Sequence, residues 1–253
     1  MSGVPAVRIA HLYPSVMNIY ADRGNMAVFA RRLEWRGLRL EVTALERGDV
    51  LGDDAAYDLF YLGGGQDTDQ RAVAHDLVET KAEGVRRARA TGAVMVCVGG
   101  GMPGAGLGET TADGERIPGI GVLDLDTVAG STRLIGDLVI DAELEGEVRR
   151  VVGFENHAGR TRLGARARPL GRVVQGHGNN GEDATEGAVQ GHAIGTYLHG
   201  PLLPKNPWLA DVLLRWALEH RTGAPVEFSP LDDTLADAAR AAAERRASTS
   251  HTR

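Results

Sequence analysis

The single cysteine of the 253-residue chain, Cys97, lies at the end of a short apolar run and just before three glycines. Residues 93–98 read Ala-Val-Met-Val-Cys-Val, and an apolar run of this length bounded by glycine is typical of a buried parallel strand. Active sites of open α/β sheets gather at the carboxyl ends of strands, where the chain turns toward a helix. A thiol on such a turn could attack an amide as a nucleophile, although a lone cysteine there is also a common core residue.

A thiol nucleophile needs a base, because a free cysteine is mostly protonated near neutral pH. His199 is the candidate, since it follows the apolar run 193–198 at a second predicted strand end, although a lone histidine there is more often structural. The reaction also needs donors that stabilise a developing negative charge. The backbone N–H groups of Gly64, Gly65 and Val98 are candidates for such an anion pocket, because each follows or ends a predicted strand.

The elements that must position these residues alternate regularly in the first half of the chain. We expect strands at 7–12, 38–45, 58–62 and 93–98 and helices at 25–35 and 67–90. This alternation predicts a mostly parallel sheet in a three-layer α/β domain.

The second half of the chain predicts short strands with no long helices between them, which indicates an antiparallel extension of the same domain. These strands are expected at 119–125, 134–140, 148–154 and 172–176, followed by a strand at 193–198 and a helix at 208–220. We therefore expect one domain over residues 1–225. Residues 226–253 are expected to form a C-terminal helix that frays into a disordered tail from residue 248.

Composition narrows the class of protein. Lys plus Arg is 28 against 34 Asp plus Glu, giving a net charge of −6, so we expect no nucleic-acid partner. One cysteine allows no disulfide within the chain and fits a reducing compartment. The sequence has neither a run of about 20 apolar residues nor a signal-peptide pattern, and we expect a cytoplasmic protein without a membrane span.

Five motifs in a fixed order carry a family resemblance. They are Asp-Arg-Gly-Asn at 22–25, Gly-Gly-Gly-Gln-Asp at 63–67, Gly-Phe-Glu-Asn-His-Ala-Gly-Arg at 153–160, Gly-Asn-Asn-Gly-Glu-Asp at 178–183 and Tyr-Leu-His-Gly-Pro-Leu at 197–202. Over residues 7–220 the chain resembles the glutaminase subunits of lipid II isoglutaminyl synthase, the GatD proteins. These are cobyric-acid-synthase-like class I glutamine amidotransferases with a flavodoxin-like fold.

The resemblance implies a reaction and a partner. Cys97 would attack the side-chain amide of glutamine, His199 would act as base, and water would release glutamate from the thioester. Arg133, in the segment 130–137, would bind the glutamine carboxylate, for which a guanidinium fork is well suited. The ammonia would pass to a partner subunit resembling a Mur ligase, which uses ATP and Mg²⁺ to activate the α-carboxyl of D-glutamate in a lipid-linked peptidoglycan precursor at the membrane surface. No cofactor or metal is expected in this chain, which has no G-x-x-x-x-G-K-[ST] phosphate loop.

The segment around Cys97 departs from the family pattern. The family turn reads Cys-Gly/Ala-Gly-aromatic-Gln, whereas residues 97–101 here are Cys-Val-Gly-Gly-Gly. In one register Cys97 occupies the turn with a non-strand backbone and faces His199, and Gly104 matches the family's later glycine. If the glycines are aligned instead, Val98 occupies the turn and Cys97 points into the core, because a shift of one residue reverses the face of a strand. The second register corresponds to a non-catalytic scaffold subunit.

Two other functions fit less of the sequence. Residues 99–104 match the dinucleotide fingerprint G-x-G-x-x-G, with Asp124 twenty residues beyond, but the segment that follows is too polar and broken for the required helix. A stand-alone cysteine hydrolase fits the fold but gives no reason for the motifs around Asn156 and Asn179.

Overall fold

A six-stranded sheet forms the centre of the molecule in the computed structural model, which describes residues 6–19 and 22–250. The strand order is β11-β12-β4-β3-β1-β2, and every pair is parallel except β11 with β12. The strands are β1 (Ala6–Leu12), β2 (Arg39–Leu45), β3 (Leu59–Leu62), β4 (Val94–Val98), β11 (Ala188–Gln190) and β12 (Ala193–Thr196). All residues of β3, β4 and β12 are buried, which explains why these strands read as continuous apolar runs.

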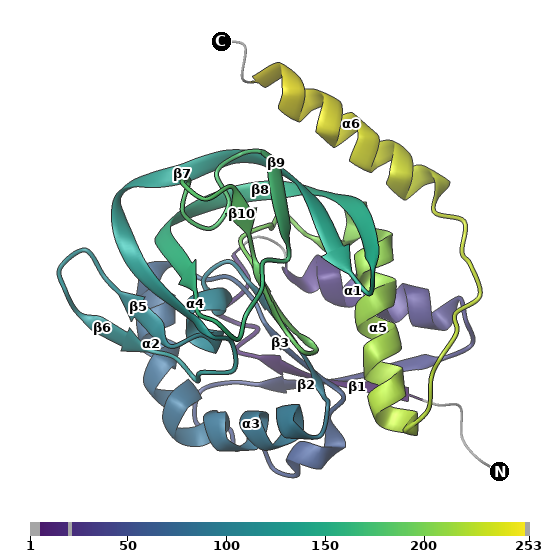
Figure 1. The fold of residues 1–253 in the computed structure, drawn as a ribbon. Coiled ribbons are helices and arrows are strands. Elements are labelled where there is room, and N and C mark those ends of the chain that lie inside the picture. Colours follow the sequence, from purple (N-terminus) through teal and green to yellow (C-terminus); the bar gives the residue numbers. More distant parts are fainter. Residues whose placement is uncertain (1–5, 20–21, 251–253) are drawn as a thin grey trace.

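Helices cover both faces of this sheet and complete three layers (Figure 1). Helices α1 (Asp22–Glu34) and α5 (Pro207–Thr222) pack with one set of strand side chains. Helices α2 (Asp67–Asp76) and α3 (Ala82–Ala90) pack with the other set. The predicted helix 67–90 is therefore present, with one widened π turn at Leu77–Lys81. The predicted fold class is confirmed.

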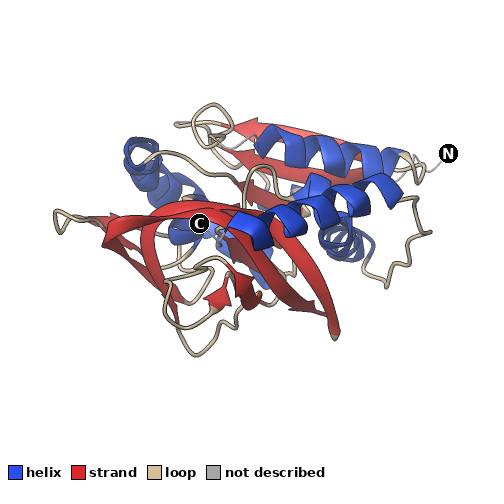
Figure 2. Ribbon diagram, turned by 90° about the horizontal axis from the view of Figure 1, so that it is seen from above, coloured by secondary structure: helices blue, strands red, loops and turns tan. Residues whose placement is uncertain are grey.

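A second, mostly antiparallel sheet packs beside the first one. Its order is β10-β9-β7-β5-β6, and β8 pairs with β7. Its strands are β5 (Gly108–Thr110), β6 (Arg116–Pro118), β7 (Leu125–Leu144), β8 (Glu147–Leu163), β9 (Gly171–Gln175) and β10 (Thr185–Glu186). Figure 2 shows β7 and β8 as a long curved band.

The β7–β8 hairpin is longer than the sequence predicts. The strands predicted at 134–140 and 148–154 are only parts of strands of 20 and 17 residues. Glu145 and Gly146 join them with φ values of 54° and 78°, the two left-handed residues that a tight hairpin turn requires. The strand predicted at 119–125 is wrong, since only Leu125 belongs to a strand.

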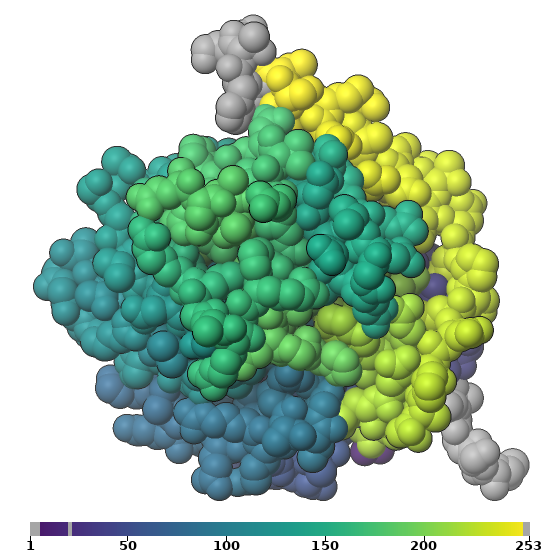
Figure 3. Space-filling model, in the orientation of Figure 1, coloured from purple at the N-terminus to yellow at the C-terminus, as the bar shows by residue number. Residues whose placement is uncertain are grey.

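Helix α6 (Thr234–Ser250) lies along the outside of the second sheet (Figures 2 and 3). Ala243 and Ala247 pack against Val139 and Val152. Two ion pairs flank this contact, Arg150 with Glu244 and Arg246 with Asp137. The helix runs into the residues predicted to fray, and 251–253 lie outside the described part of the chain. Within the described ranges, no helix combines the length and apolarity that crossing a membrane requires.

Candidate active site

The turn after β4 begins two residues later than Cys97. Cys97 pairs with Leu62 of β3 on one side and with Gly195 of β12 on the other, so its backbone belongs to the strand. The chain leaves the sheet at Gly99, whose φ is +55°, and helix α4 (Gly101–Ala105) follows at once. The sharp strand-to-helix turn is therefore centred on Gly99.

Cys97 lies in the core and not at this turn. Its exposed fraction is 0%, and it belongs to the apolar cluster formed with Met95 and the α2–α3 side of the sheet. Burial raises the pKa of its thiol well above the usual range, although Arg89 partly opposes this. The predicted non-strand backbone at Cys97 is wrong, because pairing with both neighbouring strands extends β4 through Val98.

The alternative register, in which Val98 occupies the turn, is also wrong. This side chain is buried in the cluster on the opposite face of the sheet, together with Leu198. Neither predicted register placed the turn at Gly99. Cys97 points into the core, as the second register predicted.

His199 lies opposite the turn. Its backbone exchanges two hydrogen bonds with Phe154 of β8, at 3.0 and 3.1 Å, and its ring packs at 5.8 Å from the Phe154 ring. The side chain is buried, and desolvation followed by the charge of His157 lowers the pKa of His199 to about 4. The imidazole is therefore neutral near pH 7, and the lowered pKa makes it a weaker base than an ordinary histidine.

The glycines that follow β3 meet the turn from the other side. A carbon attached to Gly99 would lie 3.5 Å from the Gly64 Cα atom and 4.0 Å from His199 Cδ2. The Gly64 N–H donates to Asp22 Oδ2 at 3.4 Å, and Gly65 lines the neighbouring cavity. The structure thus brings Gly64, Gly65 and His199 together around Gly99, while the role of the glycines as an anion pocket stays a prediction.

A cavity of about 420 Å³ opens above this turn, a volume suited to a small molecule. Its lining combines glycines of the two loops with polar side chains from the start of α2, from the second sheet and from Tyr197. The lining residues include Gly65, Gln66, Asp67, Gln70, Gly99, Gly100, Glu109, Arg133, Asn156, His157 and Tyr197. Cys97 does not contribute to this lining.

Arg133 of β7 lies at the cavity, where the resemblance places a glutamine-binding arginine. Its Nε atom donates to Asn156 Oδ1 at 2.7 Å, and its Nη2 atom donates to the Asn156 carbonyl oxygen at 2.8 Å. These two bonds fix the plane of the guanidinium. Nη1 and the second Nη2 hydrogen can still form a fork to a ligand carboxylate.

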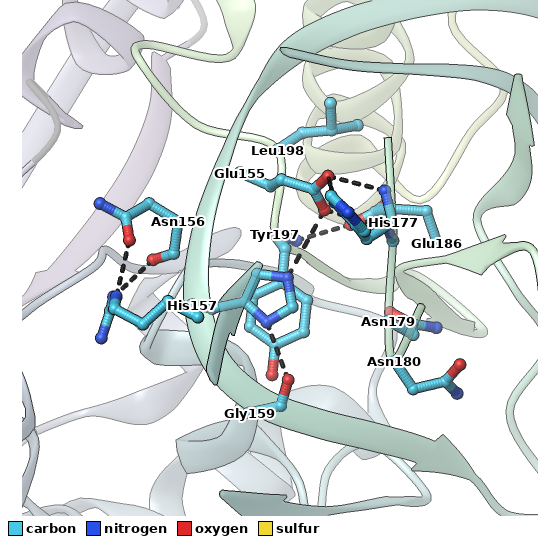
Figure 4. Close-up of polar contacts among 12 residues, drawn as sticks. Glu155, Asn156, His157, Gly159, His177, Asn179, Asn180, Glu186, Tyr197 and Leu198 are labelled. Carbon is cyan, nitrogen blue, oxygen red and sulfur yellow. Dashed lines mark hydrogen bonds and ion pairs between the residues drawn. The ribbon is translucent and has the colours of Figure 1, made fainter. Parts of the chain in front are cut away.

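The two motifs at 153–160 and 178–183 meet behind the cavity. Glu155 is fully buried and accepts hydrogen bonds from the backbone N–H groups of His177 and Gly178, at 2.7 and 2.9 Å. Burial alone would raise the pKa of Glu155, but the His157 ring, whose Nε2 atom lies 3.6 Å from Oε2, and the hydrogen bonds from His177 hold it below its usual value. Figure 4 shows His157 lying over the Tyr197 ring, and the ring centroids are 3.6 Å apart. These contacts between the two motifs hold the part of β8 from which Asn156 and His157 face the cavity.

Glu109 is a site residue that motif matching missed. It follows the glycine-rich turn and lines the same cavity as Arg133. Burial raises the pKa of Glu109 to about 7, with a further contribution from Asp67, while Arg71 and Arg133 lower it. The signal in the sequence is the first carboxylate after a glycine-rich run, which is too common to identify a site by itself.

Residues 8–207 match the CobB/CobQ-like glutamine amidotransferase domain. The chain belongs to this family. A Staphylococcus aureus protein named lipid II isoglutaminyl synthase (glutamine-hydrolyzing) subunit GatD is 36% identical over 225 residues, which cover 89% of each chain. Its namesake in Streptococcus pneumoniae is 36% identical over 230 residues, covering 90% of this chain and 87% of its own. A cobyric acid synthase of Pelotomaculum thermopropionicum is 32% identical over 229 residues, but the match covers only 41% of that longer protein.

Solved structures support the fold alone. A glutamine amidotransferase crystal structure superposes with a TM-score of 0.53 at 15% identity, covering 82% of this chain and 98% of its own. PurLQS from Thermotoga maritima superposes with a TM-score of 0.50 at 20% identity, covering 78% and 88%. Together the comparisons confirm the predicted family and the predicted enzyme class, a subunit of the lipid II isoglutaminyl synthase kind.

Proposed function

We propose that this chain is the amidotransferase subunit of a two-subunit enzyme that amidates the α-carboxyl of D-glutamate in lipid II. The observation that carries the proposal is the 36% identity with two GatD proteins over nearly 90% of both chains. The cavity supports the proposal, because its size suits an amino acid such as glutamine and Arg133 is held in place there by two hydrogen bonds to Asn156. Glutamine is the nitrogen donor that the names of these relatives imply.

The second subunit must activate the acceptor. The sequence of this chain contains no phosphate-binding loop of the G-x-x-x-x-G-K-[ST] type, so ATP and Mg²⁺ belong in the partner. We infer a partner resembling a Mur ligase, working in the cytoplasm at the membrane surface where its lipid-linked acceptor lies. A joint assembly also keeps ammonia from being protonated and lost in solution.

Glutamine hydrolysis by a Cys97–His199 pair remains a prediction from the resemblance. The reaction requires a thiol within reach of both the base and the substrate amide. His199 is placed where a base is needed, because it is neutral and lies beside the turn. The burial of Cys97 in the core favours the second candidate function, a subunit that keeps the fold, the cavity and the partner but has no nucleophile of its own.

Co-expression with a Mur-ligase-like protein from the same organism tests the proposal. We expect the two proteins to elute together in gel filtration at low salt. We also expect the purified pair to amidate a D-glutamate-containing acceptor when supplied with ATP and ammonium, as followed by mass spectrometry. Separate elution together with the absence of amidation by the mixture would refute the proposal.

A further inference from the structure

The three consecutive glycines after β4 differ in the space around them. A Cβ atom on Gly101 would overlap the carbonyl oxygen of Leu62, and one on Gly100 would lie 2.5 Å from Gln70 Nε2. A Cβ atom on Gly99 would make only ordinary van der Waals contacts, the nearest being Gly64 at 3.5 Å. Position 99 is therefore the one place in this turn where a side chain fits without displacing a neighbour.

A side chain at position 99 would point at the parts needed for amide cleavage. Its Cβ atom would lie 4.0 Å from His199 Cδ2, and Gly99 itself lines the cavity that holds Arg133. The Gly99 N–H donates to the Thr196 carbonyl oxygen at 2.9 Å, which ties the turn to the strand that precedes His199. The N–H of Gly100, at the start of α4, comes directly after this position.

The backbone at Gly99 also has the conformation of a nucleophile position. Its φ of +55° is left-handed, a state that costs a residue with a side chain some strain. Nucleophile elbows hold their reactive residue on such a strained strand-to-helix turn, with the next backbone N–H as an oxyanion donor. In this chain the elbow is intact, but glycine occupies it.

We propose that position 99 is the nucleophile site of this fold and that the chain, having glycine there, binds glutamine without cleaving its amide. This inference rests on the proposed glutamine site and deepens it. Cys97 then serves only as a core residue. The nitrogen for the amidation must reach the partner as ammonia that this cavity did not generate.

The Gly99→Cys variant should restore the missing reaction. The new thiol would give its proton to His199 while its sulfur bonds to the carboxamide carbon of glutamine. Collapse of that intermediate would release ammonia, which takes the proton, and water would then cleave the thioester to glutamate. We expect glutamate release at least tenfold above that of the wild-type protein. Gly99→Ala introduces the same backbone strain without sulfur and should stay at the wild-type level.

A labelling experiment tests the inference without relying on turnover. The probe is a diazoketone analogue of glutamine, which alkylates a thiol: the thiol proton moves to the diazo carbon, N₂ leaves and a C–S bond forms. Intact-mass measurement should show no adduct on native wild-type protein and one adduct on native Gly99→Cys. Adding Arg133→Ala to Gly99→Cys should slow this labelling more than tenfold.

The outcomes separate this inference from the proposed function. If wild-type protein binds glutamine in calorimetry and Cys97 forms no adduct, both the inference and the proposed function are supported. Labelling of native wild-type protein at Cys97, or glutamate release that Cys97→Ala abolishes, would overturn the inference and leave the proposed function standing. Failure of wild-type protein to bind glutamine would remove the proposed site itself. If Gly99→Cys does not fold, as judged by circular dichroism, the wild-type and Cys97→Ala measurements still decide.

Discussion

Removal of the Arg133 guanidinium should weaken glutamine binding by about 10- to 150-fold. A charge-assisted hydrogen bond contributes about 1.5–3 kcal/mol, and each 1.4 kcal/mol is a tenfold change in the dissociation constant. The whole fork should contribute about as much as one such bond, because Arg133 is an exposed residue and solvent screens its charge. Isothermal titration calorimetry of Arg133→Ala measures the loss without requiring hydrolysis. Arg133→Lys should recover only part of it, since an ammonium cannot reproduce the fork or both bonds to Asn156.

A matched control and a modified ligand make this prediction specific. Arg162→Ala removes a guanidinium from β8, the other strand of the β7–β8 hairpin. Arg162 pairs with Glu182 at 2.8 Å, is 69% exposed and does not line the cavity. It should bind glutamine as the wild-type protein does. The α-amide of glutamine lacks the carboxylate, so Arg133→Ala and wild-type protein should bind it equally weakly. Glutamine binding by Arg133→Ala within twofold of the wild-type value would refute the assigned contact.

Three further predictions follow from buried charges. Glu109 should contact the α-ammonium group of glutamine. Because the pKa of Glu109 is raised to about 7, the affinity for glutamine measured by calorimetry should rise between pH 6 and 8. Glu109→Gln should abolish this rise. Burial raises the pKa of Glu186 to about 8, so the folded protein holds a proton that the unfolded chain releases above about pH 4.5. The free energy of unfolding in urea should therefore fall between pH 5 and 8, with a shallower fall in Glu186→Gln. Arg32 is buried between Asp211 and Asp233, with N–O distances of 2.6 Å to both. Arg32→Ala should cost about 3 kcal/mol in urea unfolding because it leaves the Asp233 carboxylate without its cation, whereas Asp211 still pairs with Arg36.

Most of the central sheet could be predicted from sequence, because its inner strands β3 and β4 are short and apolar on both faces and amphipathic helices follow β1 and β3. Each of these features leaves a local signal in the chain. The short strand β11 was not predicted. The β7–β8 hairpin leaves a weaker signal. Gly130 and Gly136 in β7, and Gly153 and Gly159 in β8, interrupt the apolar pattern. The full length of these strands follows from their pairing with each other, which is not a local property.

The candidate site was predicted in part. The family resemblance pointed to Arg133 and His199, and the structure places Arg133 at the cavity and His199 beside the turn, while their roles stay predictions. The position of the turn could not be predicted, since three identical glycines leave the register open. Only the pairing of β4 with β3 and β12 shows that the strand continues through Val98.

Glutamate release by the reconstituted pair, compared between wild type and Cys97→Ala, shows whether Cys97 is the nucleophile. The assay follows L-glutamine to glutamate in the presence of the ligase subunit, ATP and acceptor, with circular dichroism as a check on the fold. Because Cys97 is enclosed in the core below the turn at Gly99, we expect equal rates for the two proteins. Loss of glutamate release in a folded Cys97→Ala variant would contradict this expectation and restore Cys97 as the nucleophile.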